Sequence, residues 1–116
     1  MPPRVWKALL KDVLDRVARI ERYTGGMTFE EFERDTLRQD AVLYNITIIG
    51  EAATQIPQDV QQRLALPWRE MRGMRNTIVH SYFSVRLNVV WETIKNDLPA
   101  IVPLLEAALA DSSDLA

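Results

Sequence analysis

Apolar residues recur at steps of three and four positions along most of the chain, which is the spacing of one face of an α-helix. The first such segment, over about residues 4–23, has one apolar stripe at Trp6, Leu10, Val13, Val17 and Ile20. Gly25 and Gly26 follow it, and glycine readily takes the left-handed backbone conformation found at helix ends. The pattern therefore predicts a first helix that ends just before this glycine pair.

Two further helices are predicted before residue 55. Thr28 followed three residues later by Glu31 is a capping-box pattern, which predicts the start of a short helix. Asp35 or Thr36 is expected to cap a third helix over about residues 37–54. The apolar stripe of this third helix is predicted to be Leu37, Ala41, Tyr44, Ile48 and Ala52, widened by Val42, Ile46 and Ile49.

Gly50 lies inside the third helix, where glycine is about 1 kcal/mol less favourable than alanine. A glycine at such a place indicates close contact with a neighbouring helix. The adjacent Glu51 is then expected to point at the approaching helix, and to pair with a buried arginine rather than act as a catalytic base.

Prolines mark the start of the next two elements, because proline is tolerated at a first helical position. Pro57 predicts a short helix that ends near Leu64. Pro67 predicts a central helix from Trp68 to about His80.

The last third of the chain continues the helical pattern. Ser84 is expected to cap the next helix, and Pro99 and Pro103 are expected to kink or interrupt the final segment. No alternating β pattern or hairpin signal occurs. The predicted fold class is therefore all-α: a single domain over residues 1–116, built as a bundle of four to five main helices, with residues 1–3 and 111–116 frayed.

Composition narrows the functional classes. The chain has 116 residues, 47% of them apolar, which suffices for one packed core. It contains no cysteine, which excludes disulfides, zinc–thiolate sites and cysteine nucleophiles. No membrane-length apolar run and no signal-peptide pattern occurs, so a cytoplasmic protein without membrane contact is expected. The net charge of −2 argues against broad, non-specific binding of nucleic acid.

Arginines nevertheless gather in one part of this acidic chain. The window from residue 63 to residue 86 has a single acidic residue, Glu70, and these arginines: Arg63, Arg69, Arg72, Arg75 and Arg86. A planar guanidinium suits bidentate recognition of phosphate better than an ammonium does. The window is therefore a candidate anion site.

The chain's only histidine, His80, lies in the same window. Arg72, Asn76 and His80 follow one another at steps of four and share a helix face, with Arg69 one turn before them. Asn76 is placed to hydrogen-bond His80 and fix its tautomer. Arg75 lies about 140° around the helix from His80, so these two side chains of one chain are not expected to converge on one atom.

This set of side chains suits general acid–base chemistry at a phosphate, with His80 moving protons and Arg75 stabilising charge. A monomer with one histidine cannot run a two-histidine cleavage, but a symmetric dimer could bring in a second Arg75, Asn76 and His80. Metal catalysis is disfavoured, because no ligands of suitable spacing surround His80. A purely structural histidine at a helix end, beside solvated arginines, stays open as an alternative. Acyl transfer through Ser81 or Ser84 is weaker, since no nucleophile elbow is visible.

The segment from Arg75 to Tyr82 resembles the Arg-x4-His-x-Tyr form of the motif of HepT-like toxins in the HEPN superfamily. The likeness extends from about Trp6 to Ala108. Further segments resemble the family in the family's order: residues 20–23, 29–32, 39–42, 49–52, 67–68 and 90–94.

The resemblance implies an all-α HEPN bundle that forms a homodimer, with its active site in a cleft between the subunits. It implies a metal-independent ribonuclease, with no cofactor, that cuts tRNA or mRNA as the toxin of a type VII-like HepT/MntA toxin–antitoxin system. Arg75 and His80 would be catalytic, and these residues would support them or bind RNA: Arg72, Asn76 and Arg69. The antitoxin, an MntA-like minimal nucleotidyltransferase, would neutralise the toxin by transferring AMP from ATP to Tyr82, and could form a larger complex with it.

Two residues depart from the family's pattern. Ser81 stands where the family often has glycine, and Arg86 stands near a position that is commonly acidic. Neither change removes a catalytic group, but Arg86 could alter RNA affinity or antitoxin docking. Two alternative functions stay open: a catalytically inactive HEPN module that binds nucleotide or protein, and a purely structural helical dimer.

Overall fold

Helices form all the regular secondary structure of residues 3–110, which are the residues that the computed structural model describes. In chain order the elements are α1 Pro3–Thr24, α2 Phe29–Arg34, α3 Thr36–Gln55, α4 Gln58–Arg63, α5 Trp68–His80, the 3-10 turn η1 Tyr82–Ser84, α6 Leu87–Glu92, the π-helical segment η2 Thr93–Asp97, and α7 Leu98–Ala110. The predicted all-α fold is confirmed. The predicted frayed ends lie outside the described residues, apart from Pro3, which is the first residue of α1.

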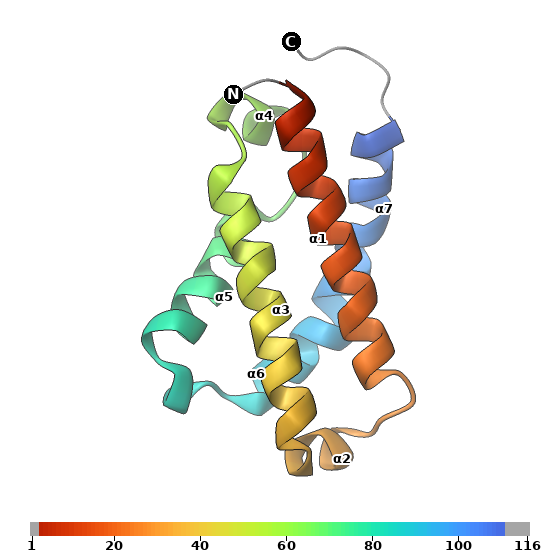
Figure 1. Ribbon diagram of the computed structural model, residues 1–116, viewed down its shortest axis with the longest axis vertical. Helices are drawn as coiled ribbons and strands as arrows, with labels where there is room; N and C mark the ends of the chain where they lie inside the picture. The colour runs from red at the N-terminus through yellow and green to blue at the C-terminus, as the bar shows by residue number, and fades with distance from the viewer. Residues whose placement is uncertain (1–2, 111–116) are drawn as a thin grey trace.

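The long helices α1 and α3 lie side by side in the centre of the bundle (Figure 1). α5 packs against α3, and α7 packs against α1. The short helices α2 and α4 lie at opposite ends of the bundle. α3 is therefore the helix that supports α5, which carries the candidate chemistry.

The apolar stripe predicted for the first helix forms part of the core. All of its members are buried: Trp6, Leu10, Val13, Val17 and Ile20. They belong to one apolar cluster with buried residues of the other helices, including Phe32 of α2 and Ile49 of α3. Burial of each such side chain stabilises the fold by about 1.5–3 kcal/mol.

The predicted caps of α2 and α3 are present. Thr28 Oγ1 accepts a hydrogen bond from the Glu31 N–H at 3.1 Å, and Glu31 Oε1 accepts one from the Thr28 N–H at 2.9 Å. This reciprocal pair confirms the capping box. Of the two candidates for the next cap, Asp35 is the one used, since it accepts from the Arg38 N–H at 3.0 Å.

The prediction that Ser84 caps the following helix is wrong. The Ser84 N–H donates to the carbonyl of Ser81 at 2.8 Å, so Ser84 closes the turn η1 instead. The extended residues Val85 and Arg86 then separate this turn from α6, whose cap position is held by Arg86 without a side-chain hydrogen bond.

The interruption expected near Pro99 takes the form of a π-helical segment rather than a break. η2 directly precedes α7, which continues through Pro103 to Ala110. Proline lacks an N–H for the carbonyl four residues earlier, and its ring crowds that carbonyl. For Pro99 this is the carbonyl of Lys95, which lies within η2, where the wider π turn keeps the helix continuous.

α3 and α5 approach each other closely at Gly50, as the sequence predicted. A Cβ atom added to Gly50 would lie 2.2 Å from the Cβ of Arg75 and 2.7 Å from the carbonyl oxygen of Met71. No larger residue fits there unless one helix moves. The absence of a side chain lets the stem of Arg75 lie directly on α3.

We expect Gly50→Ala to destabilise the fold by about 1–3 kcal/mol, because overpacking outweighs the gain of about 1 kcal/mol that alanine brings to a helix. Gly73→Ala is the matched control, since Gly73 lies inside α5 and a Cβ added there meets nothing within 4 Å. The control is expected to stabilise by about 0.5–1 kcal/mol. Urea unfolding followed by circular dichroism measures both, and equal stabilisation by the two alanines would contradict the close contact.

Candidate active site at the end of helix α5

Arg75 reaches from α5 across the contact with α3. Its Nε donates a hydrogen bond to Glu51 Oε2 at 2.9 Å, and its Nη1 donates to Asn76 Oδ1 at 2.9 Å. The side chains of Arg75 and Glu51 are 27% and 45% exposed, so the pair lies at the surface. The prediction that Glu51 pairs with an arginine is confirmed, but Arg75 is partly exposed and not buried as expected.

Asn76 does not hold His80, so that prediction is wrong. The amide oxygen of Asn76 accepts from Arg75, its neighbour in sequence, instead of serving the imidazole one turn away. His80 is the last residue of α5 and is exposed. Within the described part of the chain, the side chain of His80 makes no hydrogen bond or ion pair, which leaves its imidazole open to a ligand.

Arg75 and His80 face different parts of the surface. α5 is α-helical through both residues, so the helix does not loosen and they stay about 140° apart around its axis. Arg75 is held against α3 by Glu51, whereas His80 ends the helix in solvent. One chain therefore does not bring the two candidate catalytic groups together.

The other two predicted site arginines lie beside α4. Arg72 Nη1 donates to Gln61 Oε1 at 2.9 Å, which turns its charged end towards α4. Arg69 is exposed, and both arginines line a hollow of about 320 Å³ that also includes Trp68. These cations lie nearer the start of α5 than Arg75 and His80 do.

Tyr82 lies in η1, two residues after His80. Its hydroxyl donates a short hydrogen bond to Asp40 Oδ1 on α3, and the residue is 44% exposed. This bond to a carboxylate favours the neutral phenol and so raises the pKa of Tyr82 above its ordinary value. The hydroxyl is thus kept protonated and oriented at the surface.

Sequence reasoning did not select Asp40 as a functional residue, because it lies 42 positions from Tyr82. The spacing of acidic residues in α3 could have indicated its position. Asp40 and Glu51 are eleven positions apart, about three helical turns, and so lie on the same side of α3. That side is the one that meets α5 and η1.

Several exposed apolar side chains lie within about one helical turn of Asp40 or Tyr82 along the chain. Leu37 and Tyr44 lie one turn before and one turn after Asp40, and they are 75% and 60% exposed. Their predicted place in the apolar stripe of the third helix is therefore wrong, since α3 buries Val42, Ile46 and Ile49 instead. Phe83, in edge-to-face contact with the Tyr82 ring, is 99% exposed. Together with the exposed Val79 at the end of α5, we call this set the α3–η1 apolar surface: Leu37, Tyr44, Val79 and Phe83.

Comparison with known proteins identifies the family. The family model described as "Ribonuclease HepT-like" matches residues 13–108, a span that includes all of α3, α5 and η1. The chain belongs to the HepT-like ribonuclease family. The resemblance seen in the sequence is thereby confirmed. No solved structure matches this HepT-like chain significantly.

Curated relatives match the HepT-like chain over most of their own length. A protein named probable ribonuclease HepT, from Thermococcus cleftensis, is 39% identical over 99 residues, which are 84% of this chain and 90% of the relative. A putative RNase of Methanocaldococcus jannaschii is 37% identical over 112 residues, or 96% of this chain and 93% of the relative. A putative RNase of Caldanaerobacter subterraneus is 31% identical over 93 residues, which are 79% of this chain and 83% of the relative.

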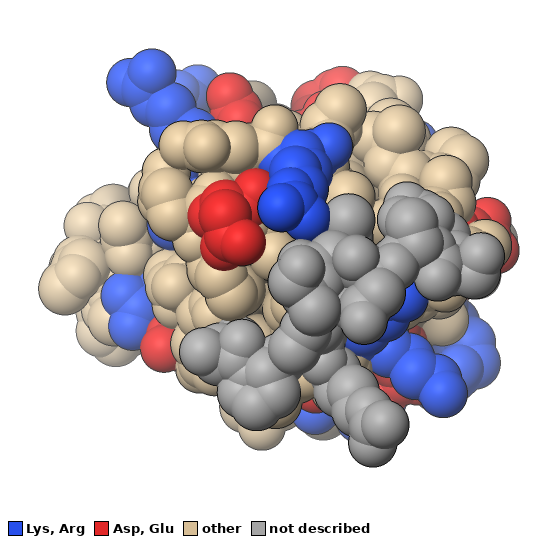
Figure 2. Space-filling view, turned by 90° about the horizontal axis from the view of Figure 1, so that it is seen from above, with Lys and Arg blue, Asp and Glu red and all other residues tan. Residues whose placement is uncertain are grey.

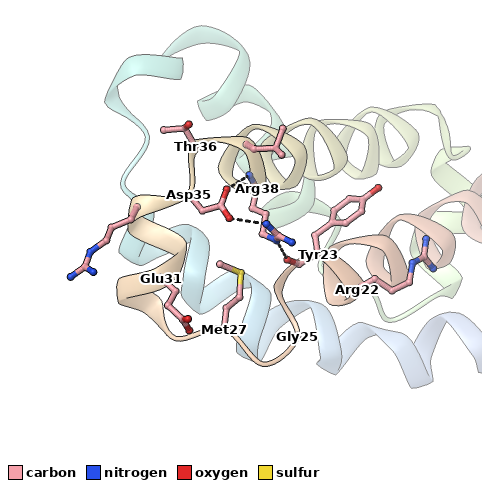
Figure 3. A pocket seen from close by; sticks show the side chains of 10 residues that line it. Arg22, Tyr23, Gly25, Met27, Glu31, Asp35, Thr36 and Arg38 are labelled. Atoms are coloured by element: carbon pink, nitrogen blue, oxygen red, sulfur yellow. Dashed lines mark hydrogen bonds and ion pairs between the residues drawn. The ribbon is translucent and has the colours of Figure 1, made fainter.

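A hollow of about 660 Å³ lies elsewhere on the HepT-like bundle, where the ends of α1, α2 and α3 meet (Figure 3). Arg38 lies in it between two acceptors: its Nη1 donates to Asp35 Oδ2 and its Nε donates to the carbonyl oxygen of Tyr23, each at 2.8 Å. The backbone N–H of Arg38, and then its side chain, lower the pKa of Asp35. The guanidinium is thus already neutralised, and the hollow contains no candidate catalytic residue.

Basic and acidic side chains are interspersed on the end of the bundle seen in Figure 2, so its described part offers no extended phosphate-binding surface. Among residues 3–110, no three His, Asp or Glu side chains are grouped so that they could hold a metal ion. In the same range, no helix of this HepT-like chain has the length and apolar character needed to span a membrane.

Proposed function

We propose that this chain is an RNA-cleaving toxin of the HepT type, in which His80 and Arg75 act on an RNA phosphate. The observation that carries this proposal is the arrangement on α5: an exposed imidazole without an internal partner ends the helix that also holds Arg75 at the surface. The names of its relatives, a probable ribonuclease and putative RNases, support the proposal. The whole chain, residues 1–116, acts as one HEPN domain.

The proposed roles follow from the chemistry of the side chains. The imidazole of His80 takes the proton of the attacking hydroxyl or gives one to the leaving oxygen, since its two ring nitrogens can serve as proton acceptor and donor. Arg75 stabilises the negative charge that grows on the phosphate oxygens in the transition state. Asn76 steadies Arg75, while Arg72 and Arg69 bind neighbouring phosphates. The reaction requires no metal ion.

His80→Ala and Arg75→Ala are each expected to slow RNA cleavage by at least about 100-fold, because general acid–base catalysis and charge stabilisation each contribute this much or more. The assay follows tRNA and mRNA cleavage by purified protein in the presence of EDTA. Glu106→Ala, at an exposed position of α7, is the control and is expected to cleave at the wild-type rate. RNA left intact by the wild type, or equal cleavage by His80→Ala, would contradict the proposal and favour an inactive binding module.

The toxin works as a homodimer in which two α5 helices form one composite site. Two observations support this arrangement: Arg75 and His80 of one chain diverge around α5, and two members of the α3–η1 apolar surface, Val79 and Phe83, are exposed near His80 in the chain. Burial of Phe83 alone would contribute about 1.5–3 kcal/mol. A two-fold axis near this surface places the second chain's Arg75 and His80 beside those of the first.

Phe83→Asp is expected to convert the dimer to a monomer and to lower RNA cleavage at least about tenfold, because a carboxylate buried without a partner strongly disfavours association. Leu104→Asp is the matched control, since Leu104 is also exposed, at 42%, but lies on α7. It is expected to remain dimeric and active. Light scattering coupled to size exclusion measures the mass, and a monomeric wild type or a dimeric Phe83→Asp would contradict this interface.

The toxin is switched off in the cytoplasm by an MntA-like minimal nucleotidyltransferase that attaches AMP to Tyr82. The exposed hydroxyl and its place two residues from His80 support this assignment. The phenolic oxygen attacks the α-phosphorus of ATP, pyrophosphate leaves, and the phenolic proton passes to a base. The attached AMP adds bulk and negative charge beside His80 and so excludes RNA phosphates.

Incubation with the nucleotidyltransferase and ATP is expected to add AMP to the wild type and to Tyr44→Phe, but not to Tyr82→Phe. Tyr44 is the matched control because it is more exposed than Tyr82, at 60% against 44%. Intact-protein mass spectrometry detects the adduct, and the RNA assay is expected to show that the modified protein is inactive. An adduct on Tyr82→Phe, or full activity of the modified wild type, would refute this switch.

A further inference from the structure

Glu51 makes the contact that fixes how Arg75 is presented. Its Oε2 accepts a hydrogen bond from Arg75 Nε at 2.9 Å. The bond joins α3 to α5, and the two residues are 24 positions apart in the sequence. The neighbouring Gly50 has no side chain, so the Cβ and Cγ atoms of Arg75 lie against the backbone of α3. The stem and the Nε atom of Arg75 are therefore both held by α3.

This arrangement leaves one edge of the guanidinium free. A guanidinium has five N–H groups. The Nε–H is used by Glu51 and one Nη1–H by Asn76, which leaves the second Nη1–H and the pair on Nη2. These remaining groups form the outer edge of the fork, which can bind two phosphate oxygens at once.

The charge of Glu51 has a second consequence. At 2.9 Å from Arg75 Nε, the carboxylate offsets part of the positive charge of Arg75 in the RNA-free protein. Both side chains are partly exposed, so the effect is moderated by solvent. Arg75 therefore attracts an RNA phosphate in the ground state less strongly than an unpaired arginine would, while it keeps the orientation needed in the transition state.

We propose that Glu51 is a positioning residue for RNA cleavage. It acts through Arg75, by directing the outer edge of the guanidinium at the phosphate and by restraining the ground-state attraction of Arg75 for RNA. This inference rests on the proposed ribonuclease function and assigns a role to a residue outside the Arg-x4-His-x-Tyr segment. It predicts that the effects of changing Glu51 depend on the presence of Arg75.

The binding test is a double-mutant cycle with an uncleavable 2′-O-methyl oligoribonucleotide, measured by fluorescence anisotropy at low salt. Glu51→Gln is expected to tighten binding about threefold to tenfold in the wild-type background, because it removes the charge that offsets Arg75. In the Arg75→Ala background the same change is expected to alter Kd less than about twofold, since the coupled partner is gone. Equal tightening in both backgrounds would overturn the inference.

Glu70→Gln is the matched control for binding. It removes the same charge from α5, but Glu70 has no hydrogen bond or ion pair with Arg75 in the described structure. Its effect on Kd is expected to be the same with and without Arg75. A control that depends on Arg75 as strongly as Glu51 does would show that the coupling is only a general charge effect.

Cleavage kinetics test the orienting role. Glu51→Ala is expected to lower kcat at least about tenfold without raising KM, because a misplaced guanidinium loses transition-state contacts. Glu51→Gln keeps an acceptor for Nε and is expected to retain kcat within about threefold, a rescue that simple loss of folded protein would not give. An unchanged kcat in Glu51→Ala would overturn the role.

Two different results would contradict the proposed ribonuclease function and the proposed role of Glu51. A wild type that binds the oligoribonucleotide but cleaves no RNA would end the ribonuclease proposal and, with it, the role of Glu51 in cleavage. An active wild type whose kcat and Kd respond to Glu51 without regard to Arg75 would overturn the inference alone.

Discussion

The contact of α3 with α5 at Gly50 is the constraint on which the candidate site depends. Because Gly50 has no Cβ, the stem of Arg75 lies on the α3 backbone and its Nε reaches Glu51. Any larger residue would push the helices apart and separate this pair. The fold accepts about 1 kcal/mol of unfavourable helix propensity at this glycine, and the result is one arginine held at the surface in a defined orientation.

α3 holds both ends of the motif segment through carboxylates on one side of the helix. Glu51 binds Arg75 at one end, and Asp40 binds the Tyr82 hydroxyl at the other, about 16 Å away along the helix by its rise per residue. Between them, the side chain of His80 has no partner within the described residues. The side chains proposed to position the phosphate and to carry the regulatory AMP are thus tied to α3, whereas the imidazole proposed to move protons stays free.

Local patterns predicted the helices well, because the apolar stripe of α1, the capping box at Thr28 and the close-contact glycine at Gly50 are each encoded within a few neighbouring residues. The hydrogen-bond partners of the candidate site side chains were harder to predict. The sequence alone did not show whether Asn76 hydrogen-bonds Arg75 or His80. In the structure its side-chain oxygen accepts from Arg75. The bond of Tyr82 to Asp40 joins positions 42 apart and depends on the turn η1, which also removed Ser84 from its expected cap position.

The divergence of Arg75 and His80 around α5 makes the composite dimer site the central claim, and subunit mixing tests it most directly. Wild-type and His80→Ala chains are unfolded together at a ratio of one to three, refolded, and assayed for RNA cleavage. If both histidines are needed, only wild-type homodimers are active, and the rate falls to about one-sixteenth of that of an equal total amount of protein that is all wild type. A fall to only about one-quarter, as expected from dilution of chains that work alone, would contradict the account.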